Sequence, residues 1–214
     1  MLNESQPVTA QGASLGTITP EAFFLIAEMT HRVVNEYSVA ISSLSLAATR
    51  APDPQAREDI LRATARLRDF ASAHRALQIP VVREPIDLLE YLGEICRTMS
   101  RATLDERGIS LTLTGDSVAL EASRCWRLGL IVAELITNAA RHGLARRTGA
   151  IMISIRSTRS AVFCEIIDNG NAASSPRPGR GSAIIAALIA QLGGWIDRRF
   201  TDKGTIVALS VPNT

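Results

Sequence analysis

Hydrophobic residues recur at helical spacing through the first third of the chain. Thr19-Pro20 is typical of a helix start, since Thr favours the N-cap and Pro the first helical position. The pattern predicts a long helix from there to about Arg50. Asp53-Pro54 repeats the start signal for a second helix, which extends to about Gln78. The short break between them predicts an antiparallel hairpin of two helices.

Each predicted helix carries one apolar stripe when its residues are placed at 100° intervals. The stripe of the first helix consists of Ile26, Val33, Tyr37, Ala40, Leu44 and Ala47. The stripe of the second consists of Ile60, Ala63, Leu67, Phe70, Ala71 and His74. Two helices alone leave part of such stripes in water, so a second copy is expected to complete a four-helix bundle. On this packed side, His74 is expected to be a core or interface residue.

After the hairpin the pattern changes, and short strands alternate with helices. A helix is predicted over residues 86–103, because Asp87 and Glu90 stand in the spacing of a capping box. Residues 108–113 alternate between apolar and polar like a strand, and residues 118–120 are its expected partner.

A strongly apolar helix follows, for which Ser123 is the expected N-cap and Gly143 the expected C-terminal glycine. The remaining elements are two paired strands at 150–156 and 161–167, a helix at 182–192, and a closing hairpin of strands at 195–200 and 205–211. Three helices with about five strands predict a two-layer α/β sandwich. The chain therefore divides into a flexible tail (1–19), a helical hairpin (20–80) and an α/β domain (86–214).

Composition excludes several classes of protein. Hydrophobic residues make up 46% of the 214 residues, enough for a core, and the formal net charge is only +2. That balance gives no electrostatic pull toward nucleic acid or anionic lipid. No apolar run reaches the roughly 18 residues that cross a membrane, and the first residues lack the pattern of a secretory signal. The three cysteines are expected to be buried free thiols, which favours a cytoplasmic protein: Cys96, Cys125 and Cys164.

The first candidate chemistry lies on the face of the first helix opposite its apolar stripe. His31 and Asn35 stand there one turn apart, and Arg32 adds positive charge. A neutral imidazole offers a nitrogen lone pair, so His31 can act as a nucleophile, with Asn35 orienting a water or a phosphoryl oxygen. An exposed histidine on a helix is also an ordinary surface residue, and this motif alone leaves both interpretations open.

A second group of polar residues recurs along the apolar helix before Gly143. Glu134, Asn138 and Arg141 stand at positions i, i+4 and i+7. Carboxylate and amide oxygens suit Mg²⁺ or its waters, and an arginine suits a phosphate. A solvent-facing side of the helix explains the same pattern. His142 ends this helix, where a cationic side chain suits the helix dipole.

Three glycine-containing segments follow. Asp168-Asn169-Gly170 ends an apolar strand; it is either an ordinary turn or a carboxylate that accepts a hydrogen bond from an adenine amino group. Gly179-Arg180-Gly181 opens a helix, where glycines let backbone N–H groups approach a phosphate. Lys203-Gly204-Thr205 is by default the tip of a hairpin.

The order of these motifs is more specific than any one of them. A His-bearing hairpin is followed by Glu-x-x-x-Asn, Asp-x-Gly, Gly-x-Gly and Gly-Thr. In this order, residues 21–212 resemble the catalytic core of sensor histidine kinases: a dimerising phosphoacceptor hairpin followed by a GHKL-type (Bergerat) ATP-binding domain. The H-R-V-x-N sequence at His31 is most similar to the HWE-related group of these kinases. The run from Glu134 to Gly143 resembles the N box of the family.

The resemblance implies a protein-histidine kinase of two-component signalling, with ATP and Mg²⁺ as cofactors. His31 would accept the γ-phosphoryl group and pass it to the aspartate of a response-regulator receiver domain. Asn138 would coordinate Mg²⁺, with Glu134 helping through water. Arg141 would lie near phosphate in place of the N-box lysine, and His142 would contact the nucleotide.

The glycine-containing segments would form the rest of the nucleotide site. Asp168 would recognise adenine, with Gly170 giving the base room. Gly179 and Gly181 would border the lid over the phosphates, and Thr205 would lie near the adenine. The resemblance further implies a homodimer through the hairpin and sensory input from a separate protein.

Several positions depart from the family pattern. Asn171-Ala172 replaces a second glycine, and the short segment 171–178 carries two prolines. Ala133 and the Phe163-Cys164-Glu165 segment stand where the HWE group has its histidine and tryptophan. These departures favour an alternative, an ATP-independent histidine phosphotransferase or phosphatase that relays phosphate between receiver domains through His31. A third hypothesis is a non-catalytic dimeric binding protein on the same fold.

Overall fold

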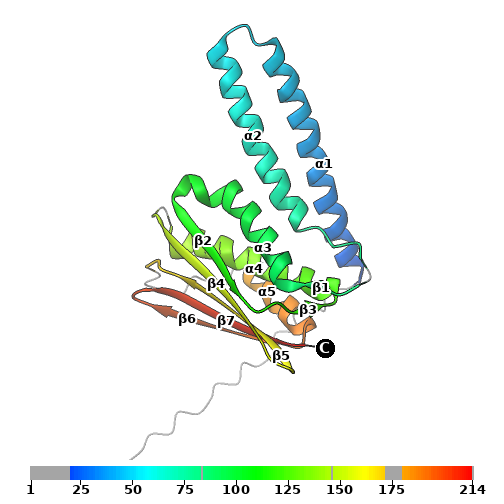
Figure 1. Cartoon of the computed structure of the whole chain (residues 1–214), viewed down its shortest axis with the longest axis vertical. Coiled ribbons are helices and arrows are strands. Elements are labelled where there is room, and N and C mark those ends of the chain that lie inside the picture. Colours follow the sequence, from blue (N-terminus) through cyan, green and yellow to red (C-terminus); the bar gives the residue numbers. More distant parts are fainter. Residues whose placement is uncertain (1–19, 83, 146, 172–179, 214) are drawn as a thin grey trace, which may run out of the picture.

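The computed structural model describes residues 20–82, 84–145, 147–171 and 180–213. It begins with the predicted hairpin, α1 (Pro20–Arg50) and α2 (Pro54–Ala76), which stands above the rest of the chain (Figure 1). The carboxylate of Asp53 accepts hydrogen bonds from the backbone N–H groups of Gln55 and Ala56, the latter at 3.0 Å. The predicted N-cap of the second helix is thus confirmed, while the predicted tail (1–19) lies outside the described residues.

The seam between α1 and α2 is rotated slightly from the predicted stripes. Ala47 and Ala63, expected inside, are exposed, and the buried positions include their neighbours Ala48 and Thr64. Thr64 tolerates burial because its hydroxyl donates to the carbonyl of Ile60 at 2.7 Å. Small side chains at these positions let the two helices approach closely, a packing effect that hydrophobicity alone does not reveal.

His74 lies on the packed side of α2, as predicted. Its ring is half-buried and tilted against the ring of Tyr37 on α1, with centroids 5.5 Å apart. This contact ties the C-terminal half of α2 to the middle of α1.

Five strands form one sheet, in the order β2-β4-β5-β7-β6. Their bounds are β2 (Ile109–Gly115), β4 (Gly149–Ser157), β5 (Ala161–Asp168), β6 (Trp195–Thr201) and β7 (Gly204–Pro212). The predicted pairs β4–β5 and β6–β7 are confirmed and antiparallel. The partner predicted for β2 is wrong: β2 runs parallel to β4. Residues 119–120 form β3 (Ala119–Leu120), which instead pairs with β1 (Ile86–Asp87).

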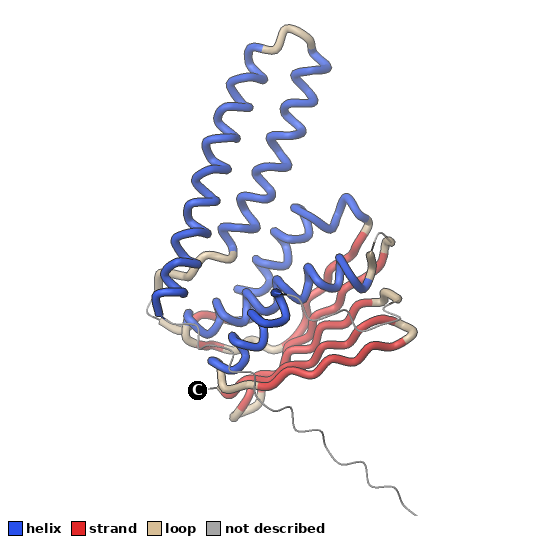
Figure 2. The backbone as a smooth tube through the Cα atoms, turned by 180° about the vertical axis from the view of Figure 1, so that it is seen from behind, coloured by secondary structure: helices blue, strands red, loops and turns tan. Residues whose placement is uncertain are grey.

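Three helices cover one face of this sheet, giving the predicted two-layer sandwich (Figure 2). The helices are α3 (Leu88–Met99), α4 (Ala122–Asn138) and α5 (Arg180–Gln191). Both α3 and α4 end in a π-helical turn, η1 (Ser100–Leu104) and η3 (Ala139–Gly143) respectively, and η1 leads into the single 3₁₀ turn η2 (Asp105–Arg107). The hydrophobic core fills the space between the helices and the sheet, with Ile131, Ile151 and Val162 fully buried.

The starts of two helices differ in how well they follow the sequence. Asp87 caps α3 by accepting from the backbone N–H of Glu90 at 2.8 Å, as its spacing predicts, and its other oxygen accepts from the hydroxyl of Ser117. The prediction for α4 is wrong, because Glu121 occupies the N-cap position. Ser123 lies inside the helix and donates its hydroxyl to the Glu121 carboxylate at 2.7 Å.

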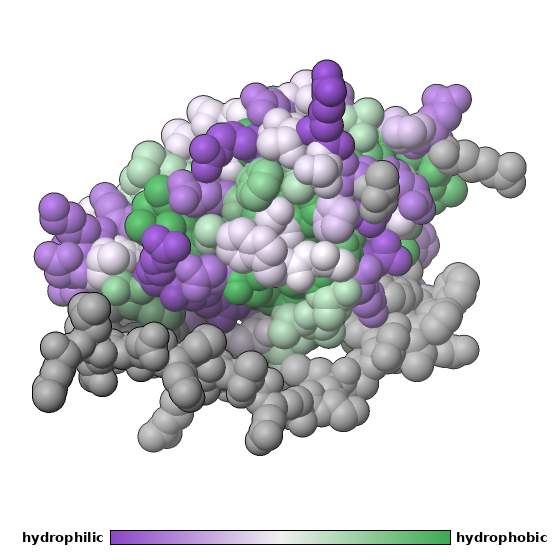
Figure 3. Space-filling model, turned by 90° about the horizontal axis from the view of Figure 1, so that it is seen from below, coloured by the Kyte–Doolittle hydropathy of each residue, from purple (hydrophilic) through white to green (hydrophobic). Residues whose placement is uncertain are grey.

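The open face of the sheet carries a few exposed apolar side chains. Met152 and Trp195 are each 51% exposed, and Phe163 is 36% exposed. Seen from below, hydrophobic residues lie among hydrophilic ones rather than in a single apolar surface (Figure 3). Scattered exposure of this kind is ordinary for a soluble domain.

The hairpin is held to the sandwich through α2. The Tyr91 hydroxyl donates to the carbonyl of Ala76 at 3.3 Å, and the Trp126 indole N–H donates to the carbonyl of Leu77 at 2.9 Å. Farther along α2, the exposed side chains of Arg66 and Glu106 form an ion pair at 2.8 Å.

The three cysteines are buried and unpaired, as predicted. Burial raises the pKa of the Cys96 thiol to about 11 and the pKa values of Cys125 and Cys164 to about 12, so all three remain protonated at neutral pH. Among the described residues, no helix has both the length and the apolar character needed to span a bilayer.

Candidate functional site

The centre of the site is the carboxylate of Asp168, the last residue of β5. Only 3% of this residue is exposed. Its Oδ1 accepts hydrogen bonds from the backbone N–H groups of Gly170, at 2.9 Å, and Thr205, at 3.4 Å. Thr205 comes within reach because β5 and β7 are neighbours and Ile167 pairs with Ile206. The sheet therefore unites two motifs that are far apart in the sequence.

Three glycines pack around Asp168, each so closely that a side chain in its place would clash. A Cβ atom on Gly143 would lie 2.5 Å from Oδ1 of Asp168. A Cβ atom on Gly170 would overlap the carbonyl of Gly143, and one on Gly204 would overlap the carbonyl of Asp168. Gly204 also has a φ of +127°, which side chains rarely adopt.

Gly143 has a different role from the one its position suggests. A glycine that ends a helix usually adopts positive φ, but the described glycines with positive φ do not include Gly143. The positive φ falls instead on Ala145, at +51°. The small size of Gly143 matters because the residue packs directly against Asp168.

The predicted polar positions of α4 lie beside this centre. Glu134 and Asn138 are half-buried, one turn apart, while Arg141 and His142 in η3 are exposed. Gly181 in α5 is so close to Glu134 that a Cβ atom there would overlap its carboxylate. The structure thus brings Gly181 close to the α4 motif, whereas Gly179 lies outside the described residues.

These residues fit an adenine nucleotide with a magnesium ion. The Oδ2 atom of Asp168 accepts no hydrogen bond from a described residue, which leaves an acceptor for an amino group. The amide of Asn138 likewise has no hydrogen-bond partner in the described part of the chain. Together with the Glu134 carboxylate, it supplies the oxygen donors that Mg²⁺ prefers.

The candidate phosphoacceptor lies on a different element. His31 and Asn35 are both exposed on α1, as predicted, and Asn35 Nδ2 lies 3.2 Å from His31 Nδ1. Arg32 turns to Glu36, with its Nε 3.4 Å from the carboxylate, rather than to the histidine. α1, which carries His31, packs against α2, whereas Asp168 ends β5 in the sandwich, so the two groups of candidate residues lie on different elements (Figure 1).

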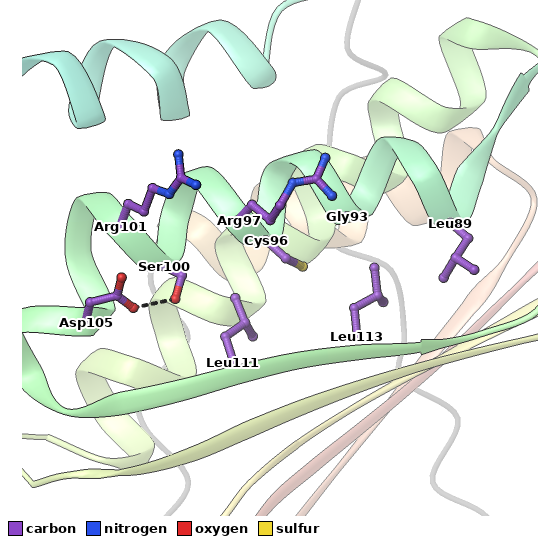
Figure 4. Close-up of a pocket in the computed structure, with 9 residues that line it drawn as sticks. All are labelled: Leu89, Gly93, Cys96, Arg97, Ser100, Arg101, Asp105, Leu111 and Leu113. Carbon is purple, nitrogen blue, oxygen red and sulfur yellow. Dashed lines mark hydrogen bonds between the residues drawn. The ribbon is translucent and has the colours of Figure 1, made fainter.

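A separate open cavity of about 510 Å³ lies between α3 and the edge strand β2. Its lining includes Cys96, Arg97, Arg101 and Leu111 (Figure 4). None of the residues singled out from the sequence as site residues lines it. The candidate chemistry therefore gathers around Asp168 at the end of β5, and not at this cavity.

Sequence reasoning missed two contributors to the site. Gly143 was predicted only as a helix end, although its place just after Asn138 could have suggested a role in the site. Arg107 gave no signal, because nothing local shows that its side chain reaches the carbonyl oxygens of Ala140 and Ala145.

Family comparisons agree with this geometry. The family model described as histidine kinase-like ATPase domain matches residues 88–211, and the model described as histidine kinase matches residues 28–103. The histidine kinase domain of a blue-light-activated kinase from Erythrobacter litoralis superposes with a TM-score of 0.59 at 20% identity, covering 84% of this chain and 94% of that one. At this identity the likeness shows the shared fold.

Two curated relatives extend the similarity across both parts of the chain. Sensor histidine kinase PdtaS of Mycobacterium tuberculosis is 28% identical over 196 residues, or 87% of this chain and 39% of the relative. Blue-light-activated histidine kinase 2 of Erythrobacter litoralis is 26% identical over 199 residues, or 87% and 56%. The chain thus spans about two fifths to just over half of the length of these relatives. Because the ATPase-domain model alone matches more than half of the residues, this chain belongs to the histidine kinase family and carries the catalytic core of a sensor histidine kinase.

Proposed function

We propose that this protein binds ATP with Mg²⁺ at the Asp168 site, autophosphorylates on His31 and passes the phosphoryl group to the aspartate of a response-regulator receiver domain. The observation that carries the proposal is the buried Asp168 carboxylate, with Oδ1 held by two backbone N–H groups and Oδ2 accepting no hydrogen bond from a described residue. A carboxylate in this setting can accept a hydrogen bond from the adenine amino group, which distinguishes adenine from guanine.

The remaining site residues would handle the phosphates. Asn138 would hold Mg²⁺, with Glu134 one turn earlier binding one of its waters; the ion supplies neutralisation of phosphate charge. Arg141 and His142 are exposed at the end of the same helix and would contact phosphate oxygens. Gly181, and with it Gly179, would let the start of α5 approach the nucleotide.

His31 is suited to receive the phosphoryl group. Asn35 Nδ2 lies 3.2 Å from His31 Nδ1 and donates a hydrogen bond to it, so Nε2 is the ring nitrogen left for reaction and loses its proton before it attacks. In the transfer, the Nε2–P bond forms as the bond between the γ-phosphorus and its bridging oxygen breaks, and ADP leaves with that oxygen. The same amide would position a water that hydrolyses the phosphoryl group of a phosphorylated receiver domain, which is phosphatase activity.

The hairpin would also form the dimer. Four exposed apolar side chains on α1 share one face at 100° per residue: Leu25, Met29, Val39 and Leu46. Pairing this stripe with a second copy would complete a four-helix bundle. We further propose that the sensory input comes from a separate protein.

A labelling experiment tests the proposal. Purified protein is incubated with Mg²⁺ and ATP labelled at the γ-phosphate, alongside His31→Gln, Asn138→Ala and the matched control His74→Gln. We expect acid-labile label on the wild type and on His74→Gln, and none on the other two. Label that persists on His31→Gln would contradict the assignment of the acceptor.

The alternative phosphotransferase keeps one observation in its favour. His31 is exposed on the hairpin, where a receiver domain can reach it without the nucleotide site. If ATP leaves no label but a phosphorylated receiver domain transfers its group to His31, the protein is a phosphotransferase and the kinase proposal is wrong.

A further inference from the structure

Arg107 joins two parts of the sandwich that are distant in sequence. It is the last residue of η2, just before β2. Its Nη2 donates a hydrogen bond to the carbonyl of Ala140 at 2.7 Å and a second to the carbonyl of Ala145. Both carbonyls belong to the segment in which α4 ends, 33 and 38 residues further along the chain.

This segment has features that require an external partner. The last turn is π-helical, with the N–H of Leu144 donating to the carbonyl of Ala139 at 2.8 Å. Carbonyls at the end of a helix lack partners within it and need donors from elsewhere. Ala145 moreover holds a positive φ of 51°, which is unfavourable for any residue with a Cβ atom. The guanidinium group satisfies two carbonyls at once and holds this conformation in place.

The same segment forms one wall of the nucleotide site. Gly143, which packs against the Asp168 carboxylate, lies between the two carbonyls that Arg107 holds. Its own carbonyl accepts a hydrogen bond from the N–H of Asn171 at 3.1 Å. A shift of the backbone here would move Gly143 relative to the Asp168 carboxylate.

We propose that Arg107 is a positioning residue for nucleotide binding: by holding the carbonyls of Ala140 and Ala145, it sets the position of Gly143 and thus the space in which Asp168 receives adenine. Arg107 acts through the backbone and does not itself contact the nucleotide. This inference rests on the proposed ATP site.

The test compares the wild type with Arg107→Ala, Arg107→Lys and the matched control Arg101→Ala. Arg101 is an exposed arginine of the neighbouring η1 turn and makes no hydrogen bond or ion pair with any described residue. Its guanidinium points away from the sheet (Figure 4). The control removes the same charge from the same region without touching the α4 end.

Three measurements are made on all four proteins: analogue binding, autokinase kinetics and hydrogen exchange. Binding of a fluorescent ATP analogue with Mg²⁺ should weaken about tenfold in Arg107→Ala, as expected for the loss of charge-assisted hydrogen bonds, and remain unchanged in Arg101→Ala. Arg107→Lys should lie between, because an ammonium cannot reproduce the planar fork. In the autokinase assay, KM for ATP should rise while kcat at saturating ATP changes less than twofold.

The third measurement is hydrogen exchange without nucleotide. Arg107→Ala should exchange faster than the wild type in peptides covering 139–145 and 168–171, and equally in the hairpin. Unchanged binding and exchange in Arg107→Ala would overturn the inference. If the wild type does not bind the analogue, the proposed ATP site is wrong, and this inference fails with it. If the wild type and Arg107→Ala bind the analogue equally well, this inference alone is overturned. If Arg107→Ala does not fold, the partial loss expected of Arg107→Lys decides the question.

Discussion

At Asp168, the absence of neighbouring side chains matters as much as the carboxylate. Two backbone N–H groups fix one of its oxygens, so the carboxylate cannot easily rotate away when a neighbouring residue is replaced by a larger one. The glycines around it therefore constrain the site more strictly than glycines that only meet the free end of a long side chain.

The substitution Gly143→Ala tests this constraint. Its Cβ atom would lie 2.5 Å from Oδ1 of Asp168, so we expect binding of the ATP analogue to weaken at least about tenfold, measured by fluorescence titration. The matched control is Gly93→Ala inside α3, where a Cβ atom meets Arg97 and Leu113 only at 3.6 and 4.0 Å. The control should bind normally and gain roughly 0.5–1 kcal/mol in unfolding free energy, since alanine favours helix. Normal binding by Gly143→Ala would refute the constraint.

The cysteines give a second prediction for individual residues. Their folded pKa values, about 11 for Cys96 and about 12 for Cys125 and Cys164, lie above the value near 8.5 of an unfolded thiol. A thiol reagent at pH 8 should therefore react at least about a hundredfold more slowly with the folded protein than in denaturant. The thiols favour folding fully below about pH 8.5, and this contribution is lost as pH rises through 11 to 12. Rapid reaction of the folded protein would show that a thiol is accessible.

Among the elements, α3 depends on its N-cap residue Asp87, which makes hydrogen bonds both inside and outside the helix. Asp87 caps the helix through Glu90 and binds Ser117, whose hydrogen bond is the main cause that lowers the pKa of Asp87. We expect Asp87→Ala to lower the free energy of urea unfolding by about 1 kcal/mol, and slightly more than the cap substitution Asp53→Ala. Because the pKa is lower when folded, this stabilisation is present above about pH 4 and is lost as pH falls further. An equal loss at pH 3 and pH 7 would contradict this explanation.

The sequence predicts elements better than it predicts their partners. Caps such as Asp53 and alternation in β4 and β5 act locally, so both were predictable. The pairing of β2 was not, because its parallel partner β4 follows only after α4, whereas residues 118–120 are the near neighbour. A short gap between two predicted strands favours pairing between those neighbours when only the local sequence is considered. The parallel pairing of β2 with β4 needs a crossover connection through α4, and it depends on how α4 packs on the sheet.

The site shows the same limit. The motif order predicted the roles proposed for Asp168 and Asn138 because each motif is continuous in sequence. The contribution of Arg107 depends on a hydrogen bond to the backbone carbonyl of a residue 33 positions further along the chain. Because every residue has such a carbonyl, the sequence does not indicate which one accepts this hydrogen bond.

At the scale of the whole molecule, the exposed stripe on α1 predicts self-association. Replacing Val39 and Leu46, which are 68% and 51% exposed, by lysine should shift the protein from dimer to monomer in sedimentation experiments. The matched control is Met152→Lys on the sheet, at a position that is also 51% exposed, and it should remain dimeric. A wild type that sediments as a monomer at all concentrations would remove the proposed bundle.

The attachment of α2 has a mechanical consequence. The hydrogen bonds from Tyr91 and Trp126 both end on its last turn, at Ala76 and Leu77, whereas the ion pair between Arg66 and Glu106 is exposed and therefore weak. The helix is thus held most firmly at its C-terminal end and can rotate about that end. With 23 residues it is about 34 Å long, so a rotation of about 10° moves its N-terminal end by roughly 6 Å. A small torque at the base of the hairpin is therefore enough to carry its tip across the width of a side chain.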